Sequence, residues 1–108
     1  MKPTTLCFVV TDTQILLGRK KRGFGADKMN GFGGKREAGE TFRQCAVREL
    51  FEEVGLVADP VKLAPVGLVD FRFPFKPEYS HVNYVYLVKE YSGTPLESKE
   101  MEPQWYPL

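Results

Sequence analysis

The sequence predicts an α+β fold in which a mixed β-sheet packs against a helix. Short apolar, β-branched runs occur on both sides of one segment with helical periodicity, at residues 41–54. That segment carries its own start and stop signals. The 108 residues are enough for one domain with one core, so residues 1–108 are interpreted as a single domain.

The first part of the chain contains two strand-like segments and a glycine-rich loop. Residues 6–10 form a short apolar run typical of a buried strand, and Asp12 and Thr13 then suit a turn. Residues 14–20 have strand character, apolar first and basic at the end. Five glycines between residues 22 and 34 predict a loop with demanding backbone angles.

Residues 41–54 are predicted to form the helix. Thr41 and Gln44 have the spacing of a capping box, which marks its start, and Gly55 is a natural stop. The predicted apolar face consists of Ala46, Val47, Leu50, Phe51 and Val54.

The second half predicts two more strands, at residues 61–73 and 82–90, joined through residues 74–77. Residues 92–95 predict a turn. The chain then runs to residues 105–108, where there is no polar tail and no element is assigned.

The composition is that of an ordinary soluble globular protein, with 43% hydrophobic and 27% charged residues. A net charge of +1 gives no reason to expect nucleic acid or a membrane surface as a partner.

The basic run at residues 19–22 is either a solvated strand end or a phosphate-attracting patch. Cys7 and Cys45 lack metal-ligand spacing and suit buried free thiols, and His81, alone, suits a strand position. The sequence shows no signal peptide and no membrane-spanning segment, so a cytoplasmic location is expected, with a nuclear or mitochondrial fraction as the alternative. The protein is also expected to be a monomer.

Acidic side chains gather around the predicted helix. Glu49, Glu52 and Glu53 fall within one arc of roughly 100° on the helix, and Glu40 precedes it. Like charges three or four residues apart repel, and a bound cation would remove that cost. Arg48 can fix a carboxylate by bidentate hydrogen bonds. The plainer alternative is a solvated acidic face with pairs such as Arg48 and Glu52.

Carboxylate oxygens suit Mg²⁺, with Mn²⁺ as a second choice, rather than zinc. Mg²⁺ held in this way retains positions for water and for substrate phosphates. The acidic helix therefore points to hydrolysis at phosphorus, in which the metal neutralises phosphate charge and activates a water.

The same segment resembles the Nudix box, Gly-x5-Glu-x7-Arg-Glu-U-x-Glu-Glu-x-Gly-U, where U is a bulky aliphatic residue. Every defined place is filled, by Gly34, Glu40, Arg48, Glu49, Leu50, Glu52, Glu53, Gly55 and Leu56. The resemblance implies an α/β/α sandwich and a metal-dependent hydrolase of nucleoside diphosphates linked to another moiety. It also implies metal ligands at Glu49, Glu52 and Glu53, which Arg48 orients. Gly34 joins this metal-site set, and Glu40 is a secondary candidate.

The flanking residues resemble a eukaryotic subgroup of this family that hydrolyses oxidised purine nucleoside triphosphates, such as 8-oxo-dGTP and 2-hydroxy-dATP, to the monophosphate and pyrophosphate. The similarity covers residues 16–26, 29–35 and 93–105. It implies that Asn30 hydrogen-bonds the purine and that Glu100 approaches the metal or its water. The expected catalytic residues are thus Arg48, Glu53 and Glu100, and the remaining base-pocket residues are Thr5, Lys20, Phe24 and Phe71.

These positions also have plainer interpretations. Asn30 before Gly31 suits a turn. Phe24 is either a core plug or an exposed stacking face, and Phe71 suits core packing on an aromatic strand face.

Two departures from the subgroup affect the expected function. Met29 stands where the subgroup usually has Trp. The chain stops at Leu108, before a second helix, another strand and an acidic pair that reads the base, so a fragment with exposed apolar sheet surface is expected. The alternatives are a Nudix hydrolase of another substrate, such as a dinucleoside polyphosphate, and a truncated nucleotide-binding module without turnover.

Overall fold

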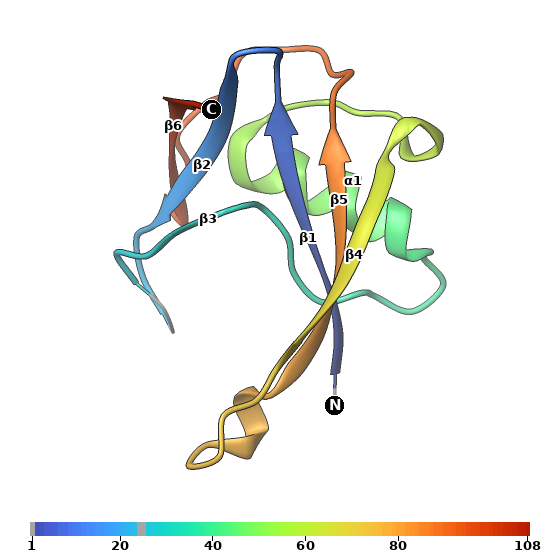
Figure 1. Ribbon diagram of the computed structural model, residues 1–108, viewed down its shortest axis with the longest axis vertical. Coiled ribbons are helices and arrows are strands. Elements are labelled where there is room, and N and C mark those ends of the chain that lie inside the picture. Colours follow the sequence, from blue (N-terminus) through green and yellow to red (C-terminus); the bar gives the residue numbers. More distant parts are fainter. Residues whose placement is uncertain (1, 24–25) are drawn as a thin grey trace.

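The computed structural model describes residues 2–23 and 26–108 (Figure 1). Its strands form one six-stranded mixed sheet, and the helix α1 (Phe42–Val54) lies across one face. The predicted α+β class is therefore confirmed. The strands are β1 (Lys2–Val10), β2 (Gln14–Lys20), β3 (Met29–Asn30), β4 (Ala64–Phe71), β5 (His81–Val88) and β6 (Met101–Pro107).

The strand order is β3-β2-β1-β5-β4, with β6 paired to β2 outside this path. β1 and β5 are parallel over eight residue pairs, from Lys2 and His81 to Val9 and Val88. β2 meets β1 only near the turn that joins them, and it pairs with β6 along its whole length. β2 thus diverges from β1, and residues 29–34 run between the two strands.

The helix begins and ends as the sequence predicts. The Thr41 side chain accepts a hydrogen bond from the Gln44 N–H at 3.0 Å, and the Gln44 side chain accepts one from the Thr41 N–H at 2.8 Å. Gly55 closes the helix with a φ of 76°, which favours glycine. Phe51, predicted on the apolar face, is 58% exposed. The buried face is narrower than predicted and consists of Cys45, Ala46, Leu50 and Val54.

The core lies between α1 and the sheet. β1 contributes Cys7 and Val9 to it, and alternate residues of the strand face the other way. Both cysteines are buried free thiols, as predicted, and burial raises the pKa of the Cys7 thiol. Among the described residues, no helix is long and apolar enough to cross a membrane.

Several boundaries differ from the sequence prediction. β4 begins at Ala64 because Pro60–Lys62 forms a 3-10 turn, in which the Val61 N–H donates to the Asp59 side chain. β6 was not predicted, since its two prolines argue against a strand, but a strand that pairs along one side tolerates them. The apolar residues Val66, Leu68 and Val69 of β4 are exposed.

Candidate active site

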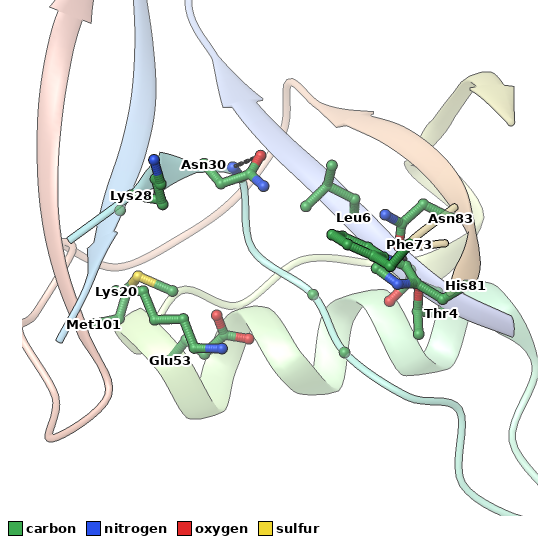
Figure 2. A pocket seen from close by; sticks show the side chains of 15 residues that line it. Thr4, Leu6, Lys20, Lys28, Asn30, Glu53, Phe73, His81, Asn83 and Met101 are labelled. Carbon is green, nitrogen blue, oxygen red and sulfur yellow. Dashed lines mark hydrogen bonds between the residues drawn. The ribbon is translucent and has the colours of Figure 1, made fainter. Parts of the chain in front are cut away.

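A cavity of about 360 Å³ opens where β2 diverges from β1 (Figure 2). Glu53 of α1 and Lys20 of β2 lie at one end. Phe73, His81 and Asn83 lie at the other, on or beside β5. The cavity therefore joins a charged end to an aromatic end, and it is large enough for a small ligand.

Glu53 is the buried acid of this cavity. Its Oε2 atom is sealed from solvent and has no hydrogen-bond partner among the described residues. Burial, followed by the hydrogen bond and charge of the neighbouring Glu49, raises the pKa of Glu53 to about 9. Without a neighbouring cation this carboxyl is therefore protonated at neutral pH.

The residue 32–34 segment lies directly against β1 and the helix. Thr5 donates its N–H to the Gly34 carbonyl at 2.9 Å, and Cys7 exchanges two backbone hydrogen bonds with Phe32. A Cβ at Gly34 would lie 2.6 Å from the Glu49 carboxylate, and one at Gly33 would lie 1.8 Å from the Thr5 carbonyl oxygen. Gly33 needs glycine because the backbone it meets cannot move, whereas a side chain at Gly34 would displace the Glu49 carboxylate.

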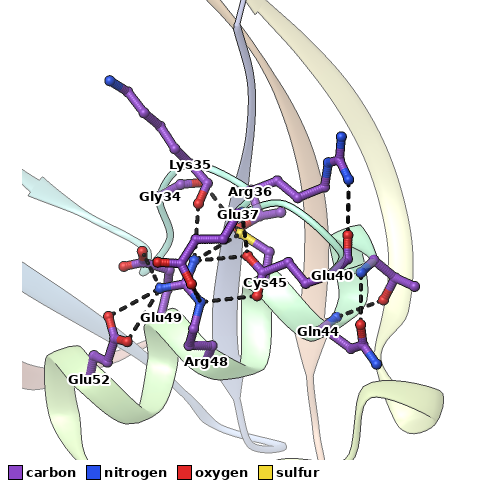
Figure 3. A network of polar contacts seen from close by, with 12 residues as sticks. Gly34, Lys35, Arg36, Glu37, Glu40, Gln44, Cys45, Arg48, Glu49 and Glu52 are labelled. Carbon is purple, nitrogen blue, oxygen red and sulfur yellow. Dashed lines mark hydrogen bonds and ion pairs between the residues drawn. The ribbon is translucent and has the colours of Figure 1, made fainter.

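Arg48 holds the other carboxylates of the motif in place (Figure 3). Its Nε and Nη2 atoms donate to the two oxygens of Glu40 at 3.0 and 2.9 Å. Its Nη1 donates to Glu49 at 3.0 Å and to Glu52 at 3.2 Å. Nη2 also donates to the Lys35 carbonyl, which ties the loop to the helix. Arg48 is thus the centre of this network of hydrogen bonds.

Glu40 has a structural environment opposite to that of Glu53. The hydrogen bonds of Arg48, followed by the Glu37 backbone N–H, lower the pKa of Glu40 to about 2. Its carboxylate is fully engaged and does not line the cavity. Glu40 therefore fastens the loop to α1.

The donor set fits a divalent cation. Glu53 has an orphaned buried oxygen, and the carboxylate of Glu49 lies beside it against Gly34. Glu52 is turned to Arg48 and is half exposed, so in the described part of the chain three acidic side chains do not converge. An incomplete set of oxygen donors suits Mg²⁺, which keeps several waters.

The structure brings some of the predicted ligand-binding residues together. Thr5, Lys20 and Asn30 line the cavity. The Thr5 hydroxyl, however, lies 3.3 Å from the Cys45 sulfur on α1. The Asn30 side chain accepts from the Gly31 N–H at 2.8 Å, so the turn role suggested by the sequence is present as well.

Other predicted residues are elsewhere or not described. The Glu100 carboxylate accepts from Arg22 at 2.8 Å, is half exposed and does not line the cavity; its neighbour Met101 does. Phe71 belongs to β4 by its backbone, and Phe24 lies outside the described residues. Met29 lies on β3 and is 39% exposed.

The basic run at residues 19–22 divides between two roles. Arg19 forms an ion pair with Glu102 of β6, and Lys21 and Arg22 form ion pairs with Glu97 and Glu100 of the segment that leads into β6. Lys20 instead lines the cavity. Because successive side chains of β2 point to opposite faces, Lys20 reaches the cavity and Arg19 does not.

The sequence interpretation missed several cavity residues: Thr4, Leu6, Lys28, Phe73, His81, Asn83 and Met101. A signal existed for two of them, since His81, expected at a strand position, is two residues from Asn83 of the predicted strand 82–90, and residues two apart share a face. The pairing of that strand with β1, which places Thr4 beside Asn83, was not evident from the sequence.

Comparison with known proteins identifies relatives that match almost the whole length of this chain. Residues 1–108 match the NUDIX domain family. The chain is 48% identical over 107 residues to the oxidized purine nucleoside triphosphate hydrolase of Danio rerio, covering 99% of this chain and 67% of that protein. It is 48% identical over 104 residues to the protein of the same name from Mus musculus, covering 96% and 65%. It thus spans about two thirds of the length of these two relatives.

Solved structures show the same fold. The MutT NUDIX hydrolase from Burkholderia pseudomallei matches with a TM-score of 0.86 at 27% identity, over 97% of this chain and 81% of that one.

Proposed function

The chain belongs to the Nudix domain family, and from this premise we propose that it hydrolyses oxidised purine (deoxy)nucleoside triphosphates to the monophosphate and pyrophosphate. One observation carries the proposal. The cavity ends at the carboxyl group of Glu53, whose Oε2 atom is sealed and lacks a partner among the described residues, and it has aromatic walls at its other end. Phosphates and a flat base therefore have suitable surroundings within one site. The relatives from Danio rerio and Mus musculus are named for this reaction.

The charged end would hold a divalent metal, with Mg²⁺ or Mn²⁺ as the proposed ion. Glu49 and Glu53 are the proposed ligands, with Glu52 joining them from the exposed side and Gly34 completing the loop that faces them. When bound, such an ion neutralises phosphate charge and lowers the pKa of a bound water.

Protein groups supply the rest of the proposed mechanism. Arg48 fixes the Glu49 carboxylate by a 3.0 Å hydrogen bond, so its orientation does not depend on the ligand. Lys20 places a positive charge beside the cavity, where it would attract the triphosphate. Glu53 is the preferred acid–base group, because it lines the cavity, whereas Glu100 is occupied by Arg22 outside it.

The aromatic end would bind the base. Phe73 and His81 stack with their ring centroids 6.3 Å apart and their planes 21° from parallel, which makes a flat wall. Asn30 stands on the opposite side of the cavity in Figure 2 and offers an amide to the purine edge. Thr5 and Phe71 remain proposed members of the base pocket.

The test is hydrolysis of 8-oxo-dGTP by the purified protein with Mg²⁺ or Mn²⁺, with dGTP, 2-hydroxy-dATP and a dinucleoside polyphosphate as comparison substrates. Glu53→Gln should lower kcat by at least about 100-fold, as removal of a buried acid–base group does. Glu90→Gln is the matched control, because Glu90 forms only a surface pair with Lys62 at 3.6 Å.

The proposal is wrong if 8-oxo-dGTP yields no monophosphate, or if Glu53→Gln is as active as Glu90→Gln. A clear preference for the dinucleoside polyphosphate would keep the chemistry and replace the substrate. Monomeric state, lack of nucleic-acid binding and a cytoplasmic location stay predictions.

A further inference from the structure

Asn83 is a buried polar residue at the aromatic end of the cavity. It lies on β5 and is 6% exposed. The parallel register pairs it with Thr4 of β1, and both residues line the cavity. Figure 2 shows the two at the same end as Phe73 and His81. A primary amide is thus built into the wall that faces a flat ligand ring.

Thr4 fixes the orientation of that amide. Its hydroxyl donates to the Asn83 Oδ1 atom and also lies 3.2 Å from the Val82 carbonyl oxygen. The carbonyl end of the Asn83 side chain is therefore engaged within the sheet, and the amide nitrogen points away from Thr4.

The amide nitrogen opens on the cavity. None of the hydrogen bonds found among the described residues uses this atom. It is also not a sealed polar atom, since within the described part of the chain Glu53 Oε2 is the one buried side-chain atom that lacks a partner. The nitrogen therefore has free N–H groups in contact with the cavity volume.

The apolar and aromatic walls around the Asn83 amide make it select ligands that offer a hydrogen-bond acceptor. Leu6 and the stacked rings of Phe73 and His81 form the walls near it. A ligand that displaces water from this end must offer an acceptor to the amide, because a buried donor without a partner weakens binding. A ligand that presents its own N–H at the same place is rejected more strongly.

We propose that Asn83 sets the base preference of the site by donating a hydrogen bond to a carbonyl oxygen on the purine edge. The inference rests on the proposed function and adds to it the class of base: 6-oxopurines are favoured over 6-aminopurines. Thr4 is a positioning residue, because it acts only by holding the amide.

Binding of two monophosphates that differ at C6, 8-oxo-dIMP and 8-oxo-dAMP, tests the proposal without requiring hydrolysis. The wild-type protein should bind 8-oxo-dIMP about tenfold more tightly, the ratio that one net hydrogen bond gives. Asn83→Leu should bring the ratio of the two Kd values close to one. Asn83→Asp, which has the same shape and lacks the donor, should favour 8-oxo-dAMP. Thr4→Val should lower the ratio, whereas Thr94→Val, in an exposed loop, should leave it unchanged.

Two results would overturn the proposal: equal binding of the two monophosphates by the wild type, or a ratio unchanged in both Asn83 variants. The midpoint of thermal unfolding is measured for each variant, and Asn83→Asp keeps the test decisive if Asn83→Leu does not fold. Loss of hydrolysis with the binding preference intact would contradict the proposed function alone, so the two failures are distinguishable.

Discussion

Substitution of Gly34 by alanine should impair the proposed site while leaving the protein folded. The new Cβ would lie 2.6 Å from the Glu49 Cδ and Oε1 atoms, and no other obstacle is as close. Ordinary contact begins at 3.4 Å, so the carboxylate must retreat by roughly 0.8 Å, and the end of a side chain can do so at little cost to the fold. A displacement of about 1 Å in a catalytic group can cost about 100-fold in rate. We therefore expect kcat/KM for 8-oxo-dGTP to fall by between about 10-fold and 100-fold.

Two other glycine substitutions serve as controls, one expected to be neutral and one expected to destabilise the fold. A Cβ at Gly67 of β4 meets nothing within 4 Å, so Gly67→Ala should leave both activity and unfolding midpoint nearly unchanged. A Cβ at Gly33 would lie 1.8 Å from the Thr5 backbone oxygen, which cannot retreat, so Gly33→Ala should destabilise the fold severely.

The assay for Gly34→Ala pairs the hydrolysis rate with the affinity for Mn²⁺, measured by electron paramagnetic resonance. Mn²⁺ affinity should fall by about tenfold or more, because the substitution moves a proposed ligand. Wild-type rate and wild-type Mn²⁺ affinity in a folded Gly34→Ala protein would refute the assignment of Glu49 to the site.

Three further predictions concern stability. Arg48→Ala should lower the free energy of unfolding by about 3 kcal/mol in urea titrations, because it leaves the Glu40 carboxylate, 14% exposed, without its partner; a loss below about 1 kcal/mol would contradict this. Since the folded pKa of Glu40 is about 2 and its ordinary value is 4.5, its contribution is complete above pH 4.5 and is lost as the pH falls toward 2. Glu40→Gln should flatten the pH dependence of the urea midpoint in that window, and an unchanged slope would disprove the pairing. Thr41→Ala should cost about 1 kcal/mol by removing the cap, with Thr94→Val as the neutral comparison.

Much of the fold was predictable because local signals and packing agree. The capping box at Thr41 and the left-handed Gly55 fix both ends of α1 without help from the rest of the chain. β6 was not predictable, because its strand conformation comes from pairing with β2 against the preference of its prolines. Phe51 was misplaced because helical periodicity gives a face but not how far the sheet extends across it.

The candidate site was predictable only where the motif is local in sequence. Glu49, Glu53 and Arg48 lie within two helical turns, so their spacing already brings them together. The aromatic end depends on β1 and β5 being parallel neighbours, a pairing of residues nearly eighty positions apart. Glu100 was expected near the metal, but its side chain pairs with Arg22 because both border the β2–β6 ladder.

The acidic motif contains carboxylates whose environments oppose one another, and this opposition explains how a dense cluster of like charges can be both stable and reactive. Glu40 is ionised and hydrogen-bonded on both oxygens, with a pKa of about 2, so it holds Arg48 in place at any physiological pH. Glu53 is sealed with an unpartnered oxygen and a pKa of about 9, so its charge is costly until a cation arrives. Their places in the motif do not distinguish the two; the difference comes from the hydrogen bonds that Arg48 donates to Glu40 and from the burial of Glu53 beside Glu49. One acid therefore stabilises the scaffold, and the other keeps its binding capacity for the ligand.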